Sequence, residues 1–428
     1  MTFLNKMYLL WLLSVLVIVT GCASNRIYRT EYTVCTVSSG SQCDKHSLQK
    51  LNAGADDAYM LGFVEVDDQG QLRDRAQLTA LIDSLYQIAV NDSVLINVFV
   101  HGWHHNAAPD DSNIESFKKS LARLSKVESD LSLTKHRATR KVIGVYVGWR
   151  GESITVPVVN GLTFWERKNT AEKVGHLGVT ELLLDLEEIT NVKNSLSPPI
   201  KSRLVVIGHS FGGAVVYSAI TQILASRFID SQAGKAYVSA ANGFGDLVVL
   251  LNPAFEALRY APFYDLAQAR CSYFDNQVPK LVILTSEADY ATKLAFPAGR
   301  IFSTFFETHD TIERNECKYS LTLDEGEADR NTVGHYLPLI SHKLTPVSDE
   351  KGLRVASYTN MKNIWSTQTS GGSTRFGSTV LTHLNKTQPR NPYLNIRVDR
   401  ELIANHNDVF GDRVMEFLRL LIELSTAY

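Results

Sequence analysis

Residues 204–216, LVVIGHSFGGAVV, place one serine among glycines between two apolar runs. The first run is typical of a buried strand, and the second continues into a segment with helical character. In a strand–turn–helix unit, the pattern G-x-S-x-G makes a turn so tight that the serine side chain stands exposed at the end of the strand. Gly208 and Gly212 lack the Cβ atoms that would clash across such a turn. The pattern therefore predicts a nucleophilic Ser210. The alternative is a glycine-rich turn whose serine only hydrogen-bonds locally.

An earlier apolar run, SVLINVFV, ends at His101, Gly102 and Trp103. A nucleophilic serine needs hydrogen-bond donors for the negative charge that develops on the oxygen of the attacked carbonyl group. Since this segment also follows a strand, its backbone N–H groups can face the same sheet edge as Ser210. We therefore expect the backbone N–H groups of Gly102, Trp103 and Phe211 to form the oxyanion hole.

The histidines of the same segment, His101, His104 and His105, are also candidates for a metal cluster. They lie on a tight loop, and no acid-rich segment accompanies them. The cysteines show no C-x-x-C spacing that would indicate zinc. We therefore expect no metal and no cofactor.

The acid that would orient a catalytic histidine is expected after a later strand. Asp289 lies just beyond the apolar run from Leu281 to Thr285 and is the preferred candidate. Glu287 is close to it, and Glu256 follows the preceding apolar run. Both remain alternatives, because position alone does not separate such carboxylates.

His406 is the expected catalytic base. It lies between the strand-like segment YLNIRV and a C-terminal helix whose apolar residues recur at helical spacing. A loop after the last strand of a parallel sheet opens at the edge where ligands bind. His309 and His335 compete because they follow Asp289 more closely. Both fall in an inserted segment, where a histidine is more often a surface or packing residue.

The composition describes an ordinary globular protein. The 428 residues are 44% hydrophobic and 21% charged, which suits one large domain with insertions or two domains. The formal charge is −2, and no dense Lys/Arg tract is present, so nothing favours nucleic acid as a partner. Continuous apolar strands alternate with helical segments, which indicates a parallel sheet covered on both faces. The oligomeric state stays open.

These segments together resemble the serine α/β-hydrolase superfamily. The resemblance rests on the strand ending in His-Gly, the Gly-His-Ser-Phe-Gly-Gly turn, and the chain order Ser, Asp, His, and it covers about residues 92–295 and 393–425. It implies an α/β fold with a mostly parallel, doubly wound sheet. It also implies a serine hydrolase of the esterase or lipase type that cleaves carboxylic esters through an acyl-enzyme. The substrate would be an ester-containing small molecule or a lipid. An acyltransferase, an amidase and a non-catalytic binding protein on this fold are the alternatives.

The resemblance also divides the chain into segments. About a hundred residues separate Asp289 from YLNIRV, where compact members of the superfamily have a short connection, so we expect a cap-like insertion or an extra subdomain over the site. The expected segments are a signal peptide (1–21), an N-terminal part with a hairpin at 60–72 and a helix (22–92), the α/β-hydrolase core (93–295), the cap or insertion (296–392), and a C-terminal strand, histidine loop and helix (393–428).

The first residues predict export. An apolar stretch from Met7 to about Val19 has the length of a signal-peptide core and is short for a membrane span. The following Val-Thr-Gly-Cys resembles the bacterial lipobox, which implies that Cys22 is lipidated and tethers the protein to a membrane. Ala23 and Ser24 favour the outer membrane of a bacterial envelope, with the protein facing the periplasm. An uncleaved N-terminal anchor with an incidental cysteine is the alternative.

The remaining cysteines agree with export. Their number is even, as expected in a compartment that permits disulfides; they are Cys35, Cys43, Cys271 and Cys317. Proximity along the chain favours Cys35 with Cys43 and Cys271 with Cys317. Four buried free thiols are the alternative.

Overall fold

A computed structural model describes most of the chain. The described ranges are 24–38, 42–153, 163–233, 236–303, 307–348, 353–357 and 360–425. Cys22 and the expected signal peptide lie outside the described residues. Within these ranges, no helix is both long enough and apolar enough to span a bilayer.

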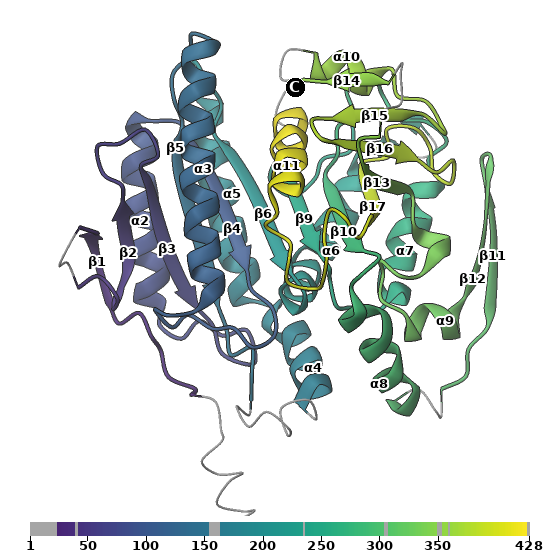
Figure 1. Ribbon diagram of the computed structural model, residues 1–428, viewed down its shortest axis with the longest axis horizontal. Helices are drawn as coiled ribbons and strands as arrows, with labels where there is room; N and C mark the ends of the chain where they lie inside the picture. The colour runs from purple at the N-terminus through teal and green to yellow at the C-terminus, as the bar shows by residue number, and fades with distance from the viewer. Residues whose placement is uncertain are drawn as a thin grey trace, which may run out of the picture.

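One large sheet organises the molecule (Figure 1). Its strand order is β1-β2-β3-β5-β4-β6-β9-β10-β17-β13-β16-β15-β14. Neighbours from β3 through to β13 are parallel, and the antiparallel pairs β2–β3, β13–β16 and β15–β16 lie towards the two ends. The strands are β1 (Glu31–Thr36), β2 (His46–Leu51), β3 (Tyr59–Glu65), β4 (Val94–Val100), β5 (Lys141–Gly148), β6 (Arg203–His209), β9 (Leu247–Leu251), β10 (Leu281–Ser286), β13 (His342–Pro346), β14 (Arg354–Ala356), β15 (Ser373–Phe376), β16 (Thr379–His383) and β17 (Tyr393–Val398).

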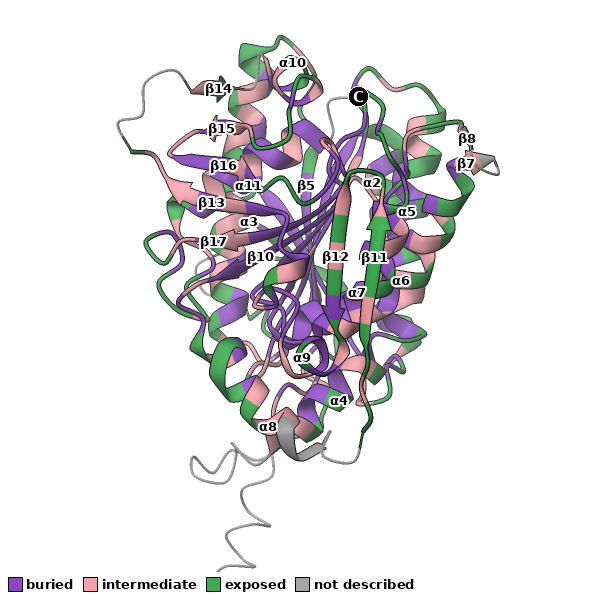
Figure 2. Cartoon of the chain, turned by 90° about the vertical axis from the view of Figure 1, so that its right-hand side faces the viewer, coloured by how far each residue is buried: buried purple, intermediate pink, exposed green. Residues whose placement is uncertain are grey.

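Helices cover both faces of this sheet (Figures 1 and 2). Along β4, Ile96 and Val98 pack into the core on one side, whereas Leu95 and Phe99 pack into the core on the other. One side is covered by α2 (Arg75–Asn91), α5 (Gly178–Ser195), α6 (Phe211–Asp230) and α7 (Ala257–Gln268), and the other by α3 (Ser112–Thr134), α10 (Met361–Ser366) and α11 (Asp412–Ser425). The protein is therefore α/β, with a mostly parallel sheet between two helical layers.

The N-terminal part joins the same sheet. The hairpin expected at residues 60–72 is only partly present, because β3 pairs antiparallel with β2 rather than with the residues that follow it. The turn after β3 is closed by one antiparallel bridge between Val66 and Leu72. A disulfide links Cys35, in β1, to Cys43, just before β2.

Part of the insertion at 296–392 joins the main sheet. Strands β13, β16, β15 and β14 extend the main sheet beyond β17, so this part of the insertion is a continuation of the core. The rest includes α8 (Phe296–Ser303), a two-stranded hairpin of β11 (Thr311–Glu316) and β12 (Tyr319–Asp324), and α9 (Glu325–Arg330). Most residues of this hairpin are at least partly exposed (Figure 2). Cys317 at its turn is disulfide-bonded to Cys271, beyond the end of α7.

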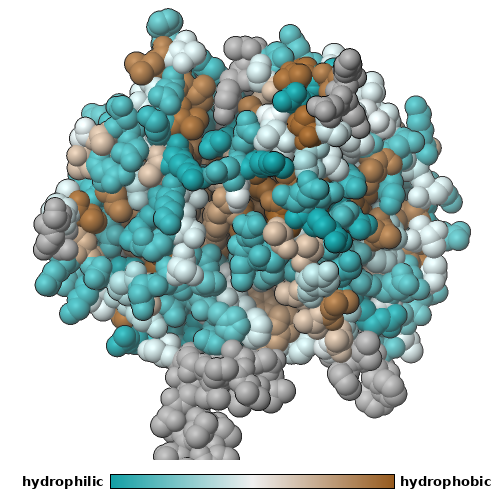
Figure 3. All heavy atoms as spheres, viewed as in Figure 1, coloured by the Kyte–Doolittle hydropathy of each residue, from teal (hydrophilic) through white to brown (hydrophobic). Residues whose placement is uncertain are grey.

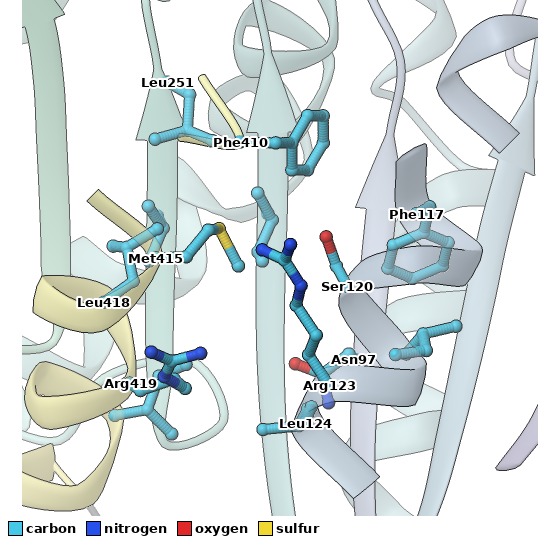
Figure 4. Close-up of a pocket in the computed structure, with 14 residues that line it drawn as sticks. Asn97, Phe117, Ser120, Arg123, Leu124, Leu251, Phe410, Met415, Leu418 and Arg419 are labelled. Atoms are coloured by element: carbon cyan, nitrogen blue, oxygen red, sulfur yellow. The ribbon is translucent and has the colours of Figure 1, made fainter. Parts of the chain in front are cut away.

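A groove runs between α3 and α11 on one face (Figure 4). Its floor includes Asn97, Ile207 and Val249 from the central strands, and its walls include Phe117 of α3 and Met415 of α11. Apolar surface is visible among polar side chains on this face (Figure 3). None of the expected catalytic residues lines this groove, so the candidate site lies elsewhere.

The sheet topology fixes where a site can form. From β4 the chain passes through α3 to β5 on one side, and then returns through α5 to β6 on the other side of β4. The carboxyl ends of β4 and β6 thus flank the point where the strand order reverses. In open α/β sheets, ligands bind at this point. Gly102 follows β4 and Ser210 follows β6, so both lie at this crevice.

Candidate active site

Ser210 is the single residue between β6 and α6, and its backbone is strained. Its φ of 55° and ψ of −121° are unusual for a residue with a side chain. The turn brings backbones into close contact, because a Cβ on Gly212 would lie 2.0 Å from the carbonyl oxygen of Val100. The N–H of Ser210 donates to the Leu251 carbonyl at 3.0 Å, which fixes the turn against β9. The strand-to-helix elbow predicted from the sequence is thus present.

A hydrogen-bonded chain joins Ser210 to two residues far away in the sequence. Nε2 of His406 lies 2.7 Å from the Ser210 hydroxyl oxygen. Nδ1 of His406 lies 2.9 Å from Oδ1 of Asp289. Since a carboxylate only accepts, Nδ1–H donates to Asp289, which leaves the Nε2 lone pair to accept the serine proton. This is the nucleophile–base–acid geometry that activates a serine.

Asp289 is fully buried and ionised. Burial by itself would raise the pKa of its carboxyl group. The hydrogen bond and charge of His406, together with two hydrogen bonds from Thr292, outweigh burial and hold the pKa of Asp289 below its usual value. A permanent negative charge next to His406 favours the imidazolium that forms when the serine loses its proton.

The loop after β4 is oriented by His101. Burial lowers the pKa of His101 to about 4, so its ring is neutral. Nε2 accepts the N–H of Trp149 at 3.1 Å, and Nδ1–H therefore donates to the carbonyl of Gly102 at 2.9 Å. In a trans peptide the following N–H points the opposite way, so the N–H of Trp103 points away from His101. Trp103 lines the same pocket as Ser210.

Gly102 and Phe211, two of the three residues expected to form an oxyanion hole, lie next to Ser210. Gly102 lies so close that a Cβ placed on it would be 2.7 Å from the Cβ of Ser210. Phe211 follows Ser210 as the first residue of α6, where a helix leaves its N–H groups without partners inside the helix. The helix dipole adds a partial positive charge at this end.

A pocket of about 260 Å³ opens above Ser210. Its described lining includes Trp103, His104, His105, Phe164, Thr292 and Asn407. The Phe164 ring packs edge-on against Trp103, with 5.2 Å between the ring centroids, and its centroid lies 4.9 Å from that of the Phe211 ring. All described lining residues lie before residue 296 or after residue 392, so none of the described residues of the insertion lines this pocket. The site thus has an aromatic side next to its reactive atoms.

The alternative acids are engaged elsewhere. Glu287 pairs with Arg397, whose Nε lies 2.8 Å from its carboxylate. Glu256 forms a buried ion pair with Lys168 of helix α4 (Phe164–Val174). Neither carboxylate is among the described partners of His406.

The alternative bases are not hydrogen-bonded to Ser210. His335 contacts the hydroxyl of Thr292 through Nε2 at 3.0 Å. His309 lies with Glu307 and Asp329 in the one group of possible metal ligands among the described residues, with ligand atoms within 4.8 Å of one another. Arg300 already pairs with both carboxylate oxygens of Asp329, at 2.5 and 2.6 Å.

Three residues that hold the site were not predicted from the sequence. Nε2 of His209 and Nδ2 of Asn252 both donate to the main-chain carbonyl of His406, each at 2.9 Å. Thr292 binds both oxygens of the Asp289 carboxylate. His209 stands inside the G-x-S-x-G pattern. No sequence signal marks Asn252 or Thr292, because the partner of Asn252 is remote in the chain and the partner of Thr292, Asp289, lies in a loop without a pattern.

Comparison of the chain with protein-family models, with curated proteins and with solved structures found no significant match.

Proposed function

We propose that this protein is a serine hydrolase that cleaves carboxylic esters. The observation that carries the proposal is the continuous hydrogen-bonded chain from the Ser210 hydroxyl through His406 to Asp289, with distances of 2.7 and 2.9 Å. The strained elbow at the carboxyl end of a central strand, with helices on both sheet faces, supports an α/β-hydrolase fold.

In this mechanism Ser210 attacks the ester carbonyl carbon while His406 Nε2 takes the hydroxyl proton. The carbonyl oxygen becomes negatively charged, and the N–H groups of Trp103 and Phe211, with Gly102 alongside, stabilise it. His406 then gives its proton to the leaving alcohol, and an acyl-enzyme remains on Ser210. Water, deprotonated by His406, attacks the acyl carbon and releases the carboxylic acid. Asp289 keeps its negative charge throughout.

The pocket favours substrates with an apolar group beside the ester. Trp103, Phe164 and Phe211 form aromatic contacts along one side, and no Lys, Arg, Asp or Glu is among the described lining residues. An uncharged ester therefore suits the reacting centre better than one with a phosphate or carboxylate close to the carbonyl.

We also propose that Cys22 tethers the protein to a bacterial membrane. The described chain starts at Ser24, which lies in a surface hollow beside Gly148 at the carboxyl end of β5. Tyr28 donates its N–H to Glu65 at the carboxyl end of β3, and Arg73 binds the carbonyl of Asn25. The chain from Asn25 to Tyr28 is thus attached to the sheet edge that bears Ser210. A lipid on Cys22 would place the pocket on the membrane side of the molecule.

The test of the catalytic proposal is covalent labelling with a fluorophosphonate probe, combined with turnover of short- and long-chain p-nitrophenyl esters. Ser210→Ala should abolish labelling and lower kcat by about 10⁴ to 10⁶. Ser218→Ala, on the adjacent helix, is the matched control and should keep both. Folded wild-type protein that neither labels nor hydrolyses esters would favour a binding protein. Labelling with acyl transfer to an added alcohol in place of hydrolysis would favour an acyltransferase.

The test of the tether is incorporation of labelled palmitate in bacterial cells. Wild-type protein should carry the label and fractionate with membranes, and Cys22→Ser should accumulate as an unlabelled precursor. Equal processing of both proteins without any label would contradict lipidation.

A further inference from the structure

The carboxylate of Asp289 has a second set of contacts beyond His406. Thr292 donates its N–H to Oδ1 at 3.1 Å, and its hydroxyl binds Oδ2 at short range. The carboxylate is therefore held at both oxygens, with the histidine and the Thr292 amide on one and the Thr292 hydroxyl on the other.

The next link is His335, which lies in the insertion. Its Nε2 is 3.0 Å from the hydroxyl oxygen of Thr292. The single proton of that hydroxyl must go to Asp289, because an ionised carboxylate has no proton to donate. The Thr292 oxygen is then the acceptor from His335, which requires the Nε2–H form of the imidazole. Donation into this oxygen strengthens the hydrogen bond that the hydroxyl makes to the carboxylate.

The surroundings keep His335 neutral and in place. It is largely buried, and burial lowers its pKa to about 4, while the charged groups that face it are Asp289, Lys293 and Arg397. Its loop is fastened at several points: Val333 donates to Phe255, Asn395 donates to the Val333 carbonyl, and the Thr332 hydroxyl contacts the Thr292 carbonyl. Gly334 permits this approach, because a Cβ there would lie 1.8 Å from the Thr285 hydroxyl of β10.

We propose that Thr292 and His335 are positioning residues that hold the Asp289 carboxylate in the orientation needed by His406. The inserted segment thus supports the proposed catalytic acid through His335, and none of its described residues lines the pocket. This inference rests on the proposed function, since positioning matters for the rate only if Ser210 is a nucleophile. Neither residue takes part in bond making, and both act through Asp289.

Paired substitutions test the proposal. Thr292→Val keeps the shape and removes the hydroxyl, and should lower kcat about 10- to 100-fold while KM changes less than about twofold. Thr292→Ser restores the hydroxyl and should stay within about threefold of wild type. His335→Leu should lower kcat about tenfold, and His335→Gln, which keeps an N–H donor, should recover most of that loss.

The control is His383→Leu. His383 is a buried histidine of the same insertion that contacts Thr387 and has no described contact with Asp289. His383→Leu should lower the melting temperature about as much as His335→Leu but leave kcat unchanged. Equal kcat losses in both leucine variants, or a rise in KM at constant kcat in Thr292→Val, would overturn the positioning role.

A spectroscopic readout separates this inference from the proposed function. The Nδ1–H proton of His406 should give a downfield resonance in protein labelled with [¹⁵N]histidine, assigned by its absence in His406→Gln. We expect Thr292→Val to shift or broaden this signal and His383→Leu to leave it unchanged. If wild-type protein neither labels nor hydrolyses esters, the hydrolase proposal fails. The resonance would still decide whether Thr292 positions Asp289: an unchanged signal in Thr292→Val would refute it.

Discussion

His209, the residue immediately before the proposed nucleophile Ser210, donates from Nε2 to the main-chain carbonyl of His406 at 2.9 Å. Asn252, after β9, donates to the same carbonyl oxygen. Burial lowers the pKa of His209 to about 3, so its ring remains a neutral donor at ordinary pH. The elbow therefore holds the backbone of its own proposed base, and the histidine loop is attached from two neighbouring strands.

Removing both donors should disturb His406 more than the single substitutions predict. Either His209→Leu or Asn252→Ala leaves one donor on the carbonyl, and each should lower kcat by about tenfold or less. The double variant leaves the His406 carbonyl without either donor, so the combined loss should exceed the product of the two single losses. Steady-state kinetics on the wild type, the two single variants and the double variant completes a double-mutant cycle. Strictly multiplicative effects would show that the two side chains act independently.

Replacing the acid should abolish most activity. Asp289→Asn keeps the size of the side chain but loses the charge and favours the wrong imidazole tautomer, so kcat should fall by about 10⁴. Glu287→Gln is the matched control, because Glu287 lies two residues from Asp289 but pairs with Arg397 of β17, and its kcat should stay within about twofold. A larger loss in Glu287→Gln than in Asp289→Asn would move the acid to Glu287.

A methyl group at Gly102 should damage the oxyanion hole. Its Cβ would lie 2.7 Å from the Cβ of Ser210 and 3.0 Å from the carbonyl oxygen of His209, so the loop must shift. We expect Gly102→Ala to lower kcat by about 10²- to 10³-fold, as when one oxyanion donor is lost. In Gly411→Ala the new Cβ would meet only the Leu402 carbonyl, at 3.6 Å, and activity should persist. Activity of Gly102→Ala close to wild type would contradict this geometry.

Stability should fall as the pH falls below about 6.5. Burial lowers the pKa of His101, His335 and His383 to about 4 each, and that of His209 to about 3. Between these values and the unfolded value of about 6.5, the unfolded chain binds protons that the folded protein does not, so acid favours unfolding. Each such histidine should contribute about 1.4 kcal/mol of destabilisation at about pH 5.5 relative to pH 8.

Urea unfolding at several pH values measures this dependence. His383→Gln should reduce the slope of the unfolding free energy against pH by the equivalent of about one bound proton. His176→Gln, which changes an exposed histidine, should leave the slope unchanged. A stability that is constant from pH 8 to about pH 5 would mean that these histidines are not buried in neutral form.

The alternation of apolar strands and helices predicted the α/β class and the parallel sheet correctly, because each strand carries its burial pattern in its own residues. The insertion was harder to predict. Its length indicated a cap or an extra subdomain, but gave no sign that β13 lies beside β17 and β16 beside β13 in the main sheet. These short strands acquire their place by pairing with distant partners, which no local pattern specifies.

Ser210 could be selected from the sequence because an elbow is a local structure: glycines two residues on either side decide whether the backbone can make the turn. The choice of its partners belongs to the tertiary structure. Parallel pairing of β10 with β17 sets Ser286 beside Val398 and brings the loops with Asp289 and His406 to one edge. His406 then meets a serine 196 residues earlier in the chain, whereas His335, nearer to Asp289 in sequence, contacts Thr292 instead. Strand register, which depends on packing across the whole sheet, decided which histidine reaches the serine.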